Sequence, residues 1–235
     1  MLTFRPNPIQ IPADYMLKKL ATIISVLFHP LLIVSYMLVL LLLINPYQFG
    51  VYSISEQGKL LLLVFMSTFV MPAFAVFMMK SLGMVQSMAL HERQERIGPY
   101  IIAGVFYLWM FINFKNNTTI PASLTVAMLG ATIGLFTAFF FNNFTKISAH
   151  AVGMGGLVGV ATINSMFYNF DTFTMHTWLF GTLELSTNFV VMAVVVLTGL
   201  VCTSRLLLEA HKPGQLYGGL AAGFLSQFVA FAFLR

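Results

Sequence analysis

The chain has 235 residues, of which 59% are hydrophobic and 8% are charged. Soluble domains carry about 25% charged residues, so this composition excludes an ordinary soluble fold. A transmembrane helix takes roughly 20 apolar residues, and the apolar share of the chain is enough for about seven. The single cysteine, Cys202, excludes an intrachain disulfide, and the absence of a Cys/His pattern at ligand spacing excludes a structural zinc module.

The formal charge of +5 does not predict nucleic-acid binding, because no basic run is longer than the pair Lys18-Lys19. The first 17 residues contain three prolines, and we expect residues 1–17 to lie outside the membrane. The apolar run that follows has no A-x-A-like cleavage site, so the sequence predicts a retained first span and not a signal peptide.

Apolar runs between charged residues and helix breakers predict seven membrane spans. In chain order they cover residues 20–44, 59–79, 98–114, 119–141, 147–168, 184–203 and 216–234. They must be helices because lipid cannot satisfy free backbone N–H and C=O groups. The predicted fold class is therefore all-α, a transmembrane bundle of six to seven spans in one domain, residues 1–235. Three pairs of small residues, Gly130/Gly134, Gly155/Gly159 and Gly219/Gly223, favour close helix contacts inside it.

Seven spans place alternate connections on opposite faces of the membrane. One face, called face X, holds the N-terminus and residues 80–97, 142–146 and 204–215. Nine of the 12 Lys and Arg residues fall on face X, which the positive-inside rule places in the cytoplasm. Five of the nine belong to the polar stretches described next, and without them the count is four against three.

Three polar stretches on face X concentrate the groups that could do chemistry. They are residues 91–99, residues 146–150, and residues 204–215, which contain Ser204-Arg205, His211 and Gln215. Arginine presents a planar fork that matches phosphate oxygens, so Arg93, Arg96 and Arg205 would form an anion clamp if they converge. Ser148 and His150 stand at the start of the fifth span, where the helix dipole also favours an anion. Histidines supply acid, base or nucleophile. A phosphate ester in apolar surroundings, hence a lipid phosphate, fits this set.

Structural explanations also exist for each of these residues. Arg93 and Arg96 can anchor the protein at lipid headgroups, and Glu92 can pair with Arg96 one helical turn away. Ser204 can be an ordinary helix-end hydroxyl, and Glu209 can pair with Arg205. The recurrence of such groups in all three face X connections is what favours a functional site.

The order and spacing of these residues resemble the type 2 phosphatidic acid phosphatase superfamily, membrane lipid phosphatases related to the soluble vanadium haloperoxidases. The pattern of that superfamily is K-x6-R-P, then P-S-G-H, then S-R-x5-H-x3-D. The third motif matches from Ser204-Arg205 to His211 but ends in Gln215 in place of Asp. The second matches as Ile147-Ser148-Ala149-His150. The first is represented by Arg96 and Pro99 with two extra residues between them, and Ala89 stands at the Lys position.

The resemblance covers about residues 80–220 and implies a haloperoxidase-like core there. Stretches such as F-H-P-L-L at 28–32 and K-I-S-A-H at 146–150 look like a bacterial branch of the superfamily, which implies an inner-membrane protein. The resemblance further implies that His211 attacks phosphorus to form a phosphohistidine and that His150 protonates the leaving alcohol and later activates water. Phosphate-binding residues would be Arg96, Ser148, Ser204 and Arg205, with Arg93. No metal or other cofactor is expected.

Two function classes follow. The first is an enzyme that hydrolyses a lipid phosphate or diphosphate, such as phosphatidate, phosphatidylglycerophosphate or a polyprenyl diphosphate. The second is a degenerate relative that binds an anionic lipid headgroup without turnover, or a component of a membrane assembly, because Gln215 supplies no charge to His211. The expected partners are a lipid phosphate substrate and membrane lipids, with no nucleic acid; protein partners stay open. A transporter is less supported, since no span carries a charged residue near its centre.

Overall fold

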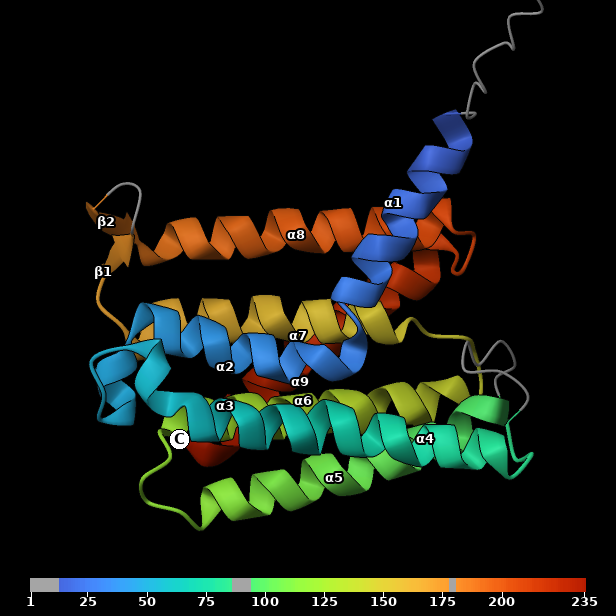
Figure 1. Ribbon diagram of the computed structural model, residues 1–235, viewed down its shortest axis with the longest axis horizontal. Helices are drawn as coiled ribbons and strands as arrows, with labels where there is room; N and C mark the ends of the chain where they lie inside the picture. Colours follow the sequence, from blue (N-terminus) through green and yellow to red (C-terminus); the bar gives the residue numbers. More distant parts are fainter. Residues whose placement is uncertain (1–12, 86–93, 178–180) are drawn as a thin grey trace, which may run out of the picture.

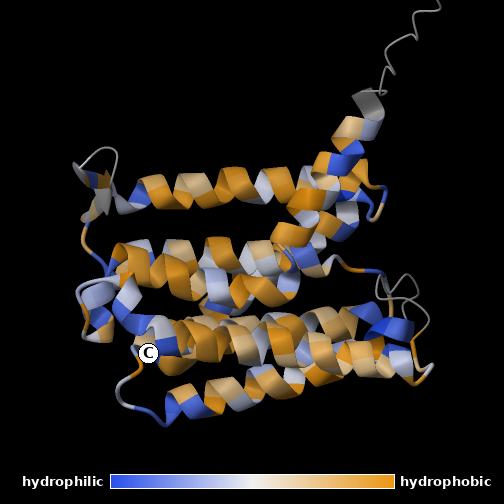
Figure 2. Cartoon of the chain, in the orientation of Figure 1, coloured by the Kyte–Doolittle hydropathy of each residue, from blue (hydrophilic) through white to orange (hydrophobic). Residues whose placement is uncertain are grey.

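The protein is a bundle of long helices that run side by side in the computed structural model, which describes residues 13–85, 94–177 and 181–235 (Figure 1). Within these residues, seven helical segments are long and apolar enough to cross a membrane. They cover Tyr15–Ile44, Pro46–Ser81, Gln94–Lys115, Ala122–Asn142, Ala149–Tyr168, Thr187–Leu207 and Pro213–Leu234. The prediction of a helical membrane bundle is thus confirmed, and Figure 2 shows apolar helices whose polar residues gather at the two ends.

The first predicted span is broken into two helices. Helix α1 covers Ala13–Leu27, a 3-10 turn η1 covers Pro30–Leu32, and α2 covers Ile33–Ile44. Pro30 has no N–H to continue the helical hydrogen bonds, so α1 ends before it. The sequence predicted one unbroken helix over residues 20–44, with residues 1–17, and so the start of α1, outside the membrane.

The second span is also irregular. After the short turns η2 (Pro46–Phe49) and η3 (Ile54–Gln57), helix α3 covers Gly58–Phe65 and α4 covers Met71–Ser81. Between them lies η4, a π-helical turn over Met66–Val70 that directly precedes Pro72. Proline removes a helical hydrogen bond and a π turn changes the bonding pattern, so both make this part of the span irregular.

The remaining five spans follow the predicted order. Helix α5 covers Ile97–Lys115 after the turn η5 (Gln94–Arg96), α6 covers Ala122–Asn142, and α7 covers Ala149–Ile163, extended by the π turn η6 (Asn164–Tyr168). Helices α8 and α9 cover Thr187–Leu207 and Pro213–Leu234. The connections that define face X lie together at the right-hand end of Figure 1, and the C-terminus lies at the other end.

A β-hairpin that the sequence analysis did not predict precedes α8. Strands β1 (Thr172–Thr177) and β2 (Gly181–Ser186) pair antiparallel, with Phe173 opposite Leu185. Alternate residues of a strand share one face, and Phe173 and Leu185 pack against the core of the bundle. Because β2 takes residues 181–186, α8 begins at Thr187 and not at the predicted residue 184. This hairpin is part of a connection, so the bundle itself remains helical.

Helix α7 is the most buried of the seven spans, and it packs against α2, α6, α8 and α9. Its contact with α9 depends on glycines, as the sequence predicted. A Cβ on Gly155 would meet the carbonyl oxygen of Leu220, and one on Gly223 would meet the carbonyl oxygen of Val152. A Cβ on Gly219 would come within 3.0 Å of the Ser148 carbonyl oxygen. The two backbones therefore approach more closely than any larger residue permits.

We predict that Gly223→Ala destabilises the protein by about 1–3 kcal/mol, because the new methyl group overlaps backbone atoms that cannot move independently. Gly218→Ala is the matched control in the same helix, since no atom lies within 4 Å of a Cβ at that position. Thermal unfolding in detergent measures both variants. Equal unfolding temperatures for the two would contradict the close α7–α9 contact.

Candidate functional site

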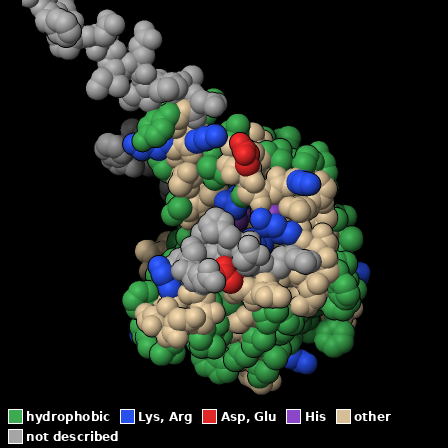
Figure 3. All heavy atoms as spheres, turned by 90° about the vertical axis from the view of Figure 1, so that its right-hand side faces the viewer, with side chains coloured by type: hydrophobic (Ala, Val, Ile, Leu, Met, Phe, Trp, Pro, Cys, Tyr) green, Lys and Arg blue, Asp and Glu red, His purple; other side chains and the backbone are tan. Residues whose placement is uncertain are grey.

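A cavity of about 510 Å3 opens among the helices at the end of the bundle that carries face X. Its lining includes two arginines and three histidines, Arg96, Arg205, His29, His150 and His211. Two tyrosines, Tyr100 and Tyr107, also line it. No described residue that lines it is an Asp or a Glu. In the space-filling view of this end (Figure 3), Lys and Arg side chains gather beside histidine near its centre. The described lining thus carries cationic and basic groups but no carboxylate, and the rest of it is mainly apolar.

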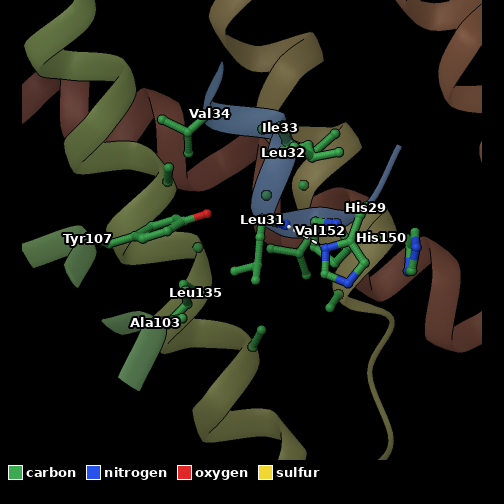
Figure 4. Close-up of a pocket in the computed structure, with 18 of the residues that line it drawn as sticks. His29, Leu31, Leu32, Ile33, Val34, Ala103, Tyr107, Leu135, His150 and Val152 are labelled. Carbon is green, nitrogen blue, oxygen red and sulfur yellow. Dashed lines mark hydrogen bonds between the residues drawn. The ribbon is translucent and has the colours of Figure 1, made fainter. Parts of the chain in front are cut away.

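The cavity is polar at one end and apolar in its depth. Figure 4 shows His29 and His150 at one end of it and Tyr107 at the other, with aliphatic side chains such as Leu31 and Leu135 between them. The cavity runs down the bundle toward Gly130 and Gln227, on α6 and α9. A ligand with a polar head and an apolar body matches this division.

The turn between α8 and α9 brings Arg205 and His211 to the same cavity. Glu209 takes a left-handed conformation with φ 53°, and the Ala210 N–H then donates to the Arg205 carbonyl oxygen at 3.1 Å. A hydrogen bond from the sixth residue back to the first, next to a left-handed residue, is typical of a helix C-terminus. His211 follows immediately, and Pro213 starts α9. The spacing of six residues from Arg205 to His211 is therefore the length of one helix-ending turn.

Gln215 fixes the tautomer of His211. Its Oε1 accepts the Lys212 backbone N–H at 3.2 Å, so this atom is the amide oxygen. The same oxygen lies 3.1 Å from Nδ1 of His211. An oxygen without a proton cannot donate, so Nδ1 carries the hydrogen, and in the neutral ring the lone pair is on Nε2. His211 is 8% exposed and lines the cavity, which makes Nε2 a candidate nucleophile.

Burial lowers the pKa of His211 to about 4, against 6.5 for an ordinary histidine. The hydrogen bond to Gln215 acts in the opposite direction, and the charges of Arg205, Arg96 and Lys146 lower this pKa further. The ring is therefore neutral at pH 7, which is the state in which Nε2 can attack an electrophile.

His150 is held by a backbone carbonyl from the end of α1. Because Pro30 has no N–H, the Val26 carbonyl is left without its helical partner, and the His29 N–H donates to it at 3.2 Å. That shift deprives the Ser25 carbonyl of the donor it would have in a regular helix. His150 Nε2 lies 3.0 Å from this oxygen and must donate to it. In the neutral ring the lone pair of His150 is therefore on Nδ1.

The two arginines of the cavity come from different helices. Arg96 stands at the start of α5, and its Nη1 donates to the Ile147 carbonyl oxygen at 3.5 Å. Arg205 lies in the last turn of α8, and its Nε is buried without a hydrogen-bond partner among the described residues. The two guanidinium groups are close enough to act on each other electrostatically. Like charges around one cavity are costly unless an anion lies between them.

The structure thus brings Arg96, His150, Arg205 and His211 to one cavity, with Gln215 bonded to His211. The two serines predicted to bind phosphate do not line that cavity. Ser148 is fully buried and accepts the Ala151 N–H as the N-cap of α7, and Ser204 donates to the Leu200 carbonyl one turn back in α8. Their hydroxyls are engaged in helix structure. Arg93 lies outside the described residues.

The structure also corrects the pairing of Glu209 with Arg205, while Glu92 lies outside the described residues. Glu209 does not pair with Arg205, because the left-handed turn carries its carboxylate out to solvent. It lies instead 3.8 Å from Lys18 of α1, as an exposed ion pair. Such a pair contributes little to stability, and Glu209 does not replace the charge missing at Gln215.

Two contributors to the site were missed from the sequence. His29 lines the cavity, and the Ser25 carbonyl orients His150. The only local signal is the proline after His29, which predicts a helix break but not its place in the bundle. The three histidines do not make a metal site, since no group of three His, Cys, Asp or Glu side chains among the described residues could hold an ion.

Comparison of the chain with models of protein families, with curated proteins and with solved structures found no match. Membership of the phosphatase superfamily therefore stays a prediction from the three motifs. What the fold establishes is the coarser statement, an integral membrane helical bundle with a cationic cavity at one end.

We predict that the His211 ring titrates with a midpoint near pH 4 in NMR spectra of histidine-labelled protein. Arg205→Gln should raise the midpoint, because it removes a positive charge that disfavours the imidazolium. Gln215→Leu should lower it, because it removes the hydrogen bond that favours the imidazolium. A His211→Asn variant assigns the signal, and Lys59→Gln, at the far end of the bundle, is the control. A wild-type midpoint near 6.5 would contradict the burial of His211.

Proposed function

We propose that the protein hydrolyses a lipid phosphate or lipid diphosphate through a phosphohistidine intermediate. The observation that carries the proposal is the cavity itself, in which Arg96, Arg205, His150 and His211 meet without a described carboxylate. The buried Nε–H of Arg205 has no hydrogen-bond partner among the described residues. A phosphate oxygen can accept this hydrogen bond. Membership of the superfamily is proposed on the same ground, since these four residues are among those that its motifs specify.

In the proposed reaction His211 Nε2 attacks phosphorus while Arg96 and Arg205 hold the phosphoryl oxygens. The bond from phosphorus to the lipid oxygen breaks, and this oxygen takes the Nδ1 proton of His150, which enters the reaction as the imidazolium and leaves this step neutral. In the second step His150 Nδ1 removes a proton from water, and the water oxygen displaces His211 from phosphorus. Inorganic phosphate leaves, and both histidines return to their starting states. The arginines favour the transition state because charge moves onto the oxygens that they contact.

The surroundings of the cavity favour a lipid substrate over a soluble phosphate ester. Its lining away from the arginines is mainly apolar, and it extends toward the middle of the bundle. An alkyl or prenyl chain placed there gains about 25 cal/mol for each Å2 of apolar surface removed from water. A soluble sugar phosphate would leave its hydroxyl groups without hydrogen-bond partners in the same space.

Release of inorganic phosphate from phosphatidate, phosphatidylglycerophosphate and a polyprenyl diphosphate tests this function on purified protein. His211→Ala and His150→Ala should each abolish turnover, because nucleophile and acid act as a unit. Arg96→Gln and Arg205→Gln should lower kcat/KM by roughly ten- to a hundredfold, the value of a hydrogen bond to a charged group. Lys59→Gln, an exposed cation at the opposite end of the bundle, should leave turnover unchanged. Equal rates for wild type and His211→Ala would reject the phosphohistidine.

Gln215 favours the second candidate function, a binding protein of the same fold. Its Oε1 also accepts the Lys212 N–H, in a capping box at the start of α9. Helix capping alone would explain the residue, and a neutral amide gives His211 orientation but no charge. A protein that uses this cavity only to hold an anionic headgroup would need no more than that.

The substitution Gln215→Glu separates the two functions, because it keeps the length of the side chain and adds the missing charge. In an active enzyme it should raise the rate of the phosphoryl-transfer step roughly tenfold, since charge-assisted hydrogen bonds are about twice as strong as neutral ones. Gln215→Leu should lower that rate by releasing His211. Single-turnover phosphate release measures both. Failure of wild type and Gln215→Glu to release phosphate from any lipid, combined with retained vanadate binding, would establish the binding protein instead.

A further inference from the structure

His29 is the third histidine of the cavity, and it belongs to none of the three motifs. It lies between α1 and η1, and its ring centroid is 6.0 Å from that of His150, with the two planes at 76°. Figure 4 shows both side chains at the same end of the cavity. The two rings therefore lie beside each other at the polar end of the cavity.

The local hydrogen bonds decide which nitrogen of His29 can donate. Nδ1 accepts the Leu31 backbone N–H at 3.3 Å, as the N-cap of η1. In the neutral ring the proton is then on Nε2. This N–H group has no hydrogen-bond partner among the described residues. Arg205 acts on His29 electrostatically, so the donor lies in the same positive field as the anion clamp.

We propose that His29 is a ligand of the phosphate group, which it contacts through Nε2–H beside Arg96 and Arg205. The break between α1 and α2 then forms a fourth part of the site. It supplies one side chain to the anion, and it supplies the Ser25 carbonyl that orients His150. This proposal rests on the proposed function only for the identity of the ligand as a phosphate. Binding of the anion requires no turnover.

Two substitutions separate a ligand role from a structural role. His29→Asn places an oxygen close to the position of Nδ1, so it keeps the cap on Leu31 and removes the donor at Nε2. His29→Gln places an amide nitrogen close to the position of Nε2, so it keeps the donor and removes the cap. If His29 has only a structural role, Asn should preserve anion binding better than Gln. If His29 is a ligand, Gln should preserve it better than Asn.

Calorimetric titration of vanadate into the full-length protein in detergent is the test, with thermal unfolding of the ligand-free protein alongside. We expect His29→Asn to weaken vanadate binding by roughly ten- to a hundredfold, the value of one hydrogen bond to a charged group. Its unfolding temperature should stay at that of wild type. We expect His29→Gln to bind vanadate within a few-fold of wild type, although its unfolding temperature falls.

An unchanged vanadate affinity in His29→Asn would overturn the proposal. Equal losses of vanadate affinity in both variants, in step with their losses of stability, would also overturn it. Phosphate release measured on the same proteins keeps this failure distinct from that of the proposed function. If the wild type turns over substrate and His29→Asn behaves like it, the phosphatase proposal stands and the proposal that His29 is a ligand fails. If the protein has no turnover but its vanadate binding depends on His29, the phosphatase proposal fails and the proposal that His29 is a ligand stands. A wild-type protein that binds no vanadate overturns both.

Discussion

The close approach of α7 and α9 is the constraint on which the site depends. His150 lies in the first turn of α7, and His211 directly precedes α9. The two helices meet through Gly155, Gly219 and Gly223, where a Cβ would run into backbone atoms of the other helix. Membrane helices gain no hydrophobic free energy by leaving lipid for each other, so this contact depends on shape and on small residues. The glycines therefore position the histidines, and Gly223 also lines the cavity.

The arginines add an electrostatic constraint to this geometry. Arg96 and Arg205 act on each other across a cavity whose described lining has no carboxylate, and Nε of Arg205 is buried without a partner. A buried cationic group is costly in apolar surroundings unless it has partners. In the proposed function, the anionic head of the lipid lies between the two guanidinium groups. The apolar depth of the cavity then determines what the rest of the ligand must be.

The break between α1 and α2 links local backbone chemistry to the site. Because Pro30 has no N–H, the Val26 carbonyl accepts the His29 N–H instead. The Ser25 carbonyl is then free to accept the hydrogen bond from His150. The Leu27 carbonyl, also at the end of α1, is capped by the Tyr36 hydroxyl at 2.7 Å. Every one of these groups would be costly if it were left unpaired in the membrane. These carbonyls at the end of α1 therefore all accept hydrogen bonds, and one of them orients His150.

The sequence by itself determined the membrane class, the seven spans and the end of the bundle at which the polar stretches meet. Each of these follows from local composition, because a bilayer imposes one length and one polarity on every span. The glycine pairs were also legible, since a close helix contact has a short local signature.

Only the tertiary structure decided which polar groups line the cavity. Ser148 and Ser204 have the right residue type, but the nearest partners of their hydroxyls are in their own helices. His29 is separated from His150 by more than 100 residues of sequence, and no local pattern places the two rings 6.0 Å apart. The hairpin of β1 and β2 likewise depends on the core beneath Phe173. Contacts between distant segments follow from how the helices pack, and packing depends on the shapes of all of them together.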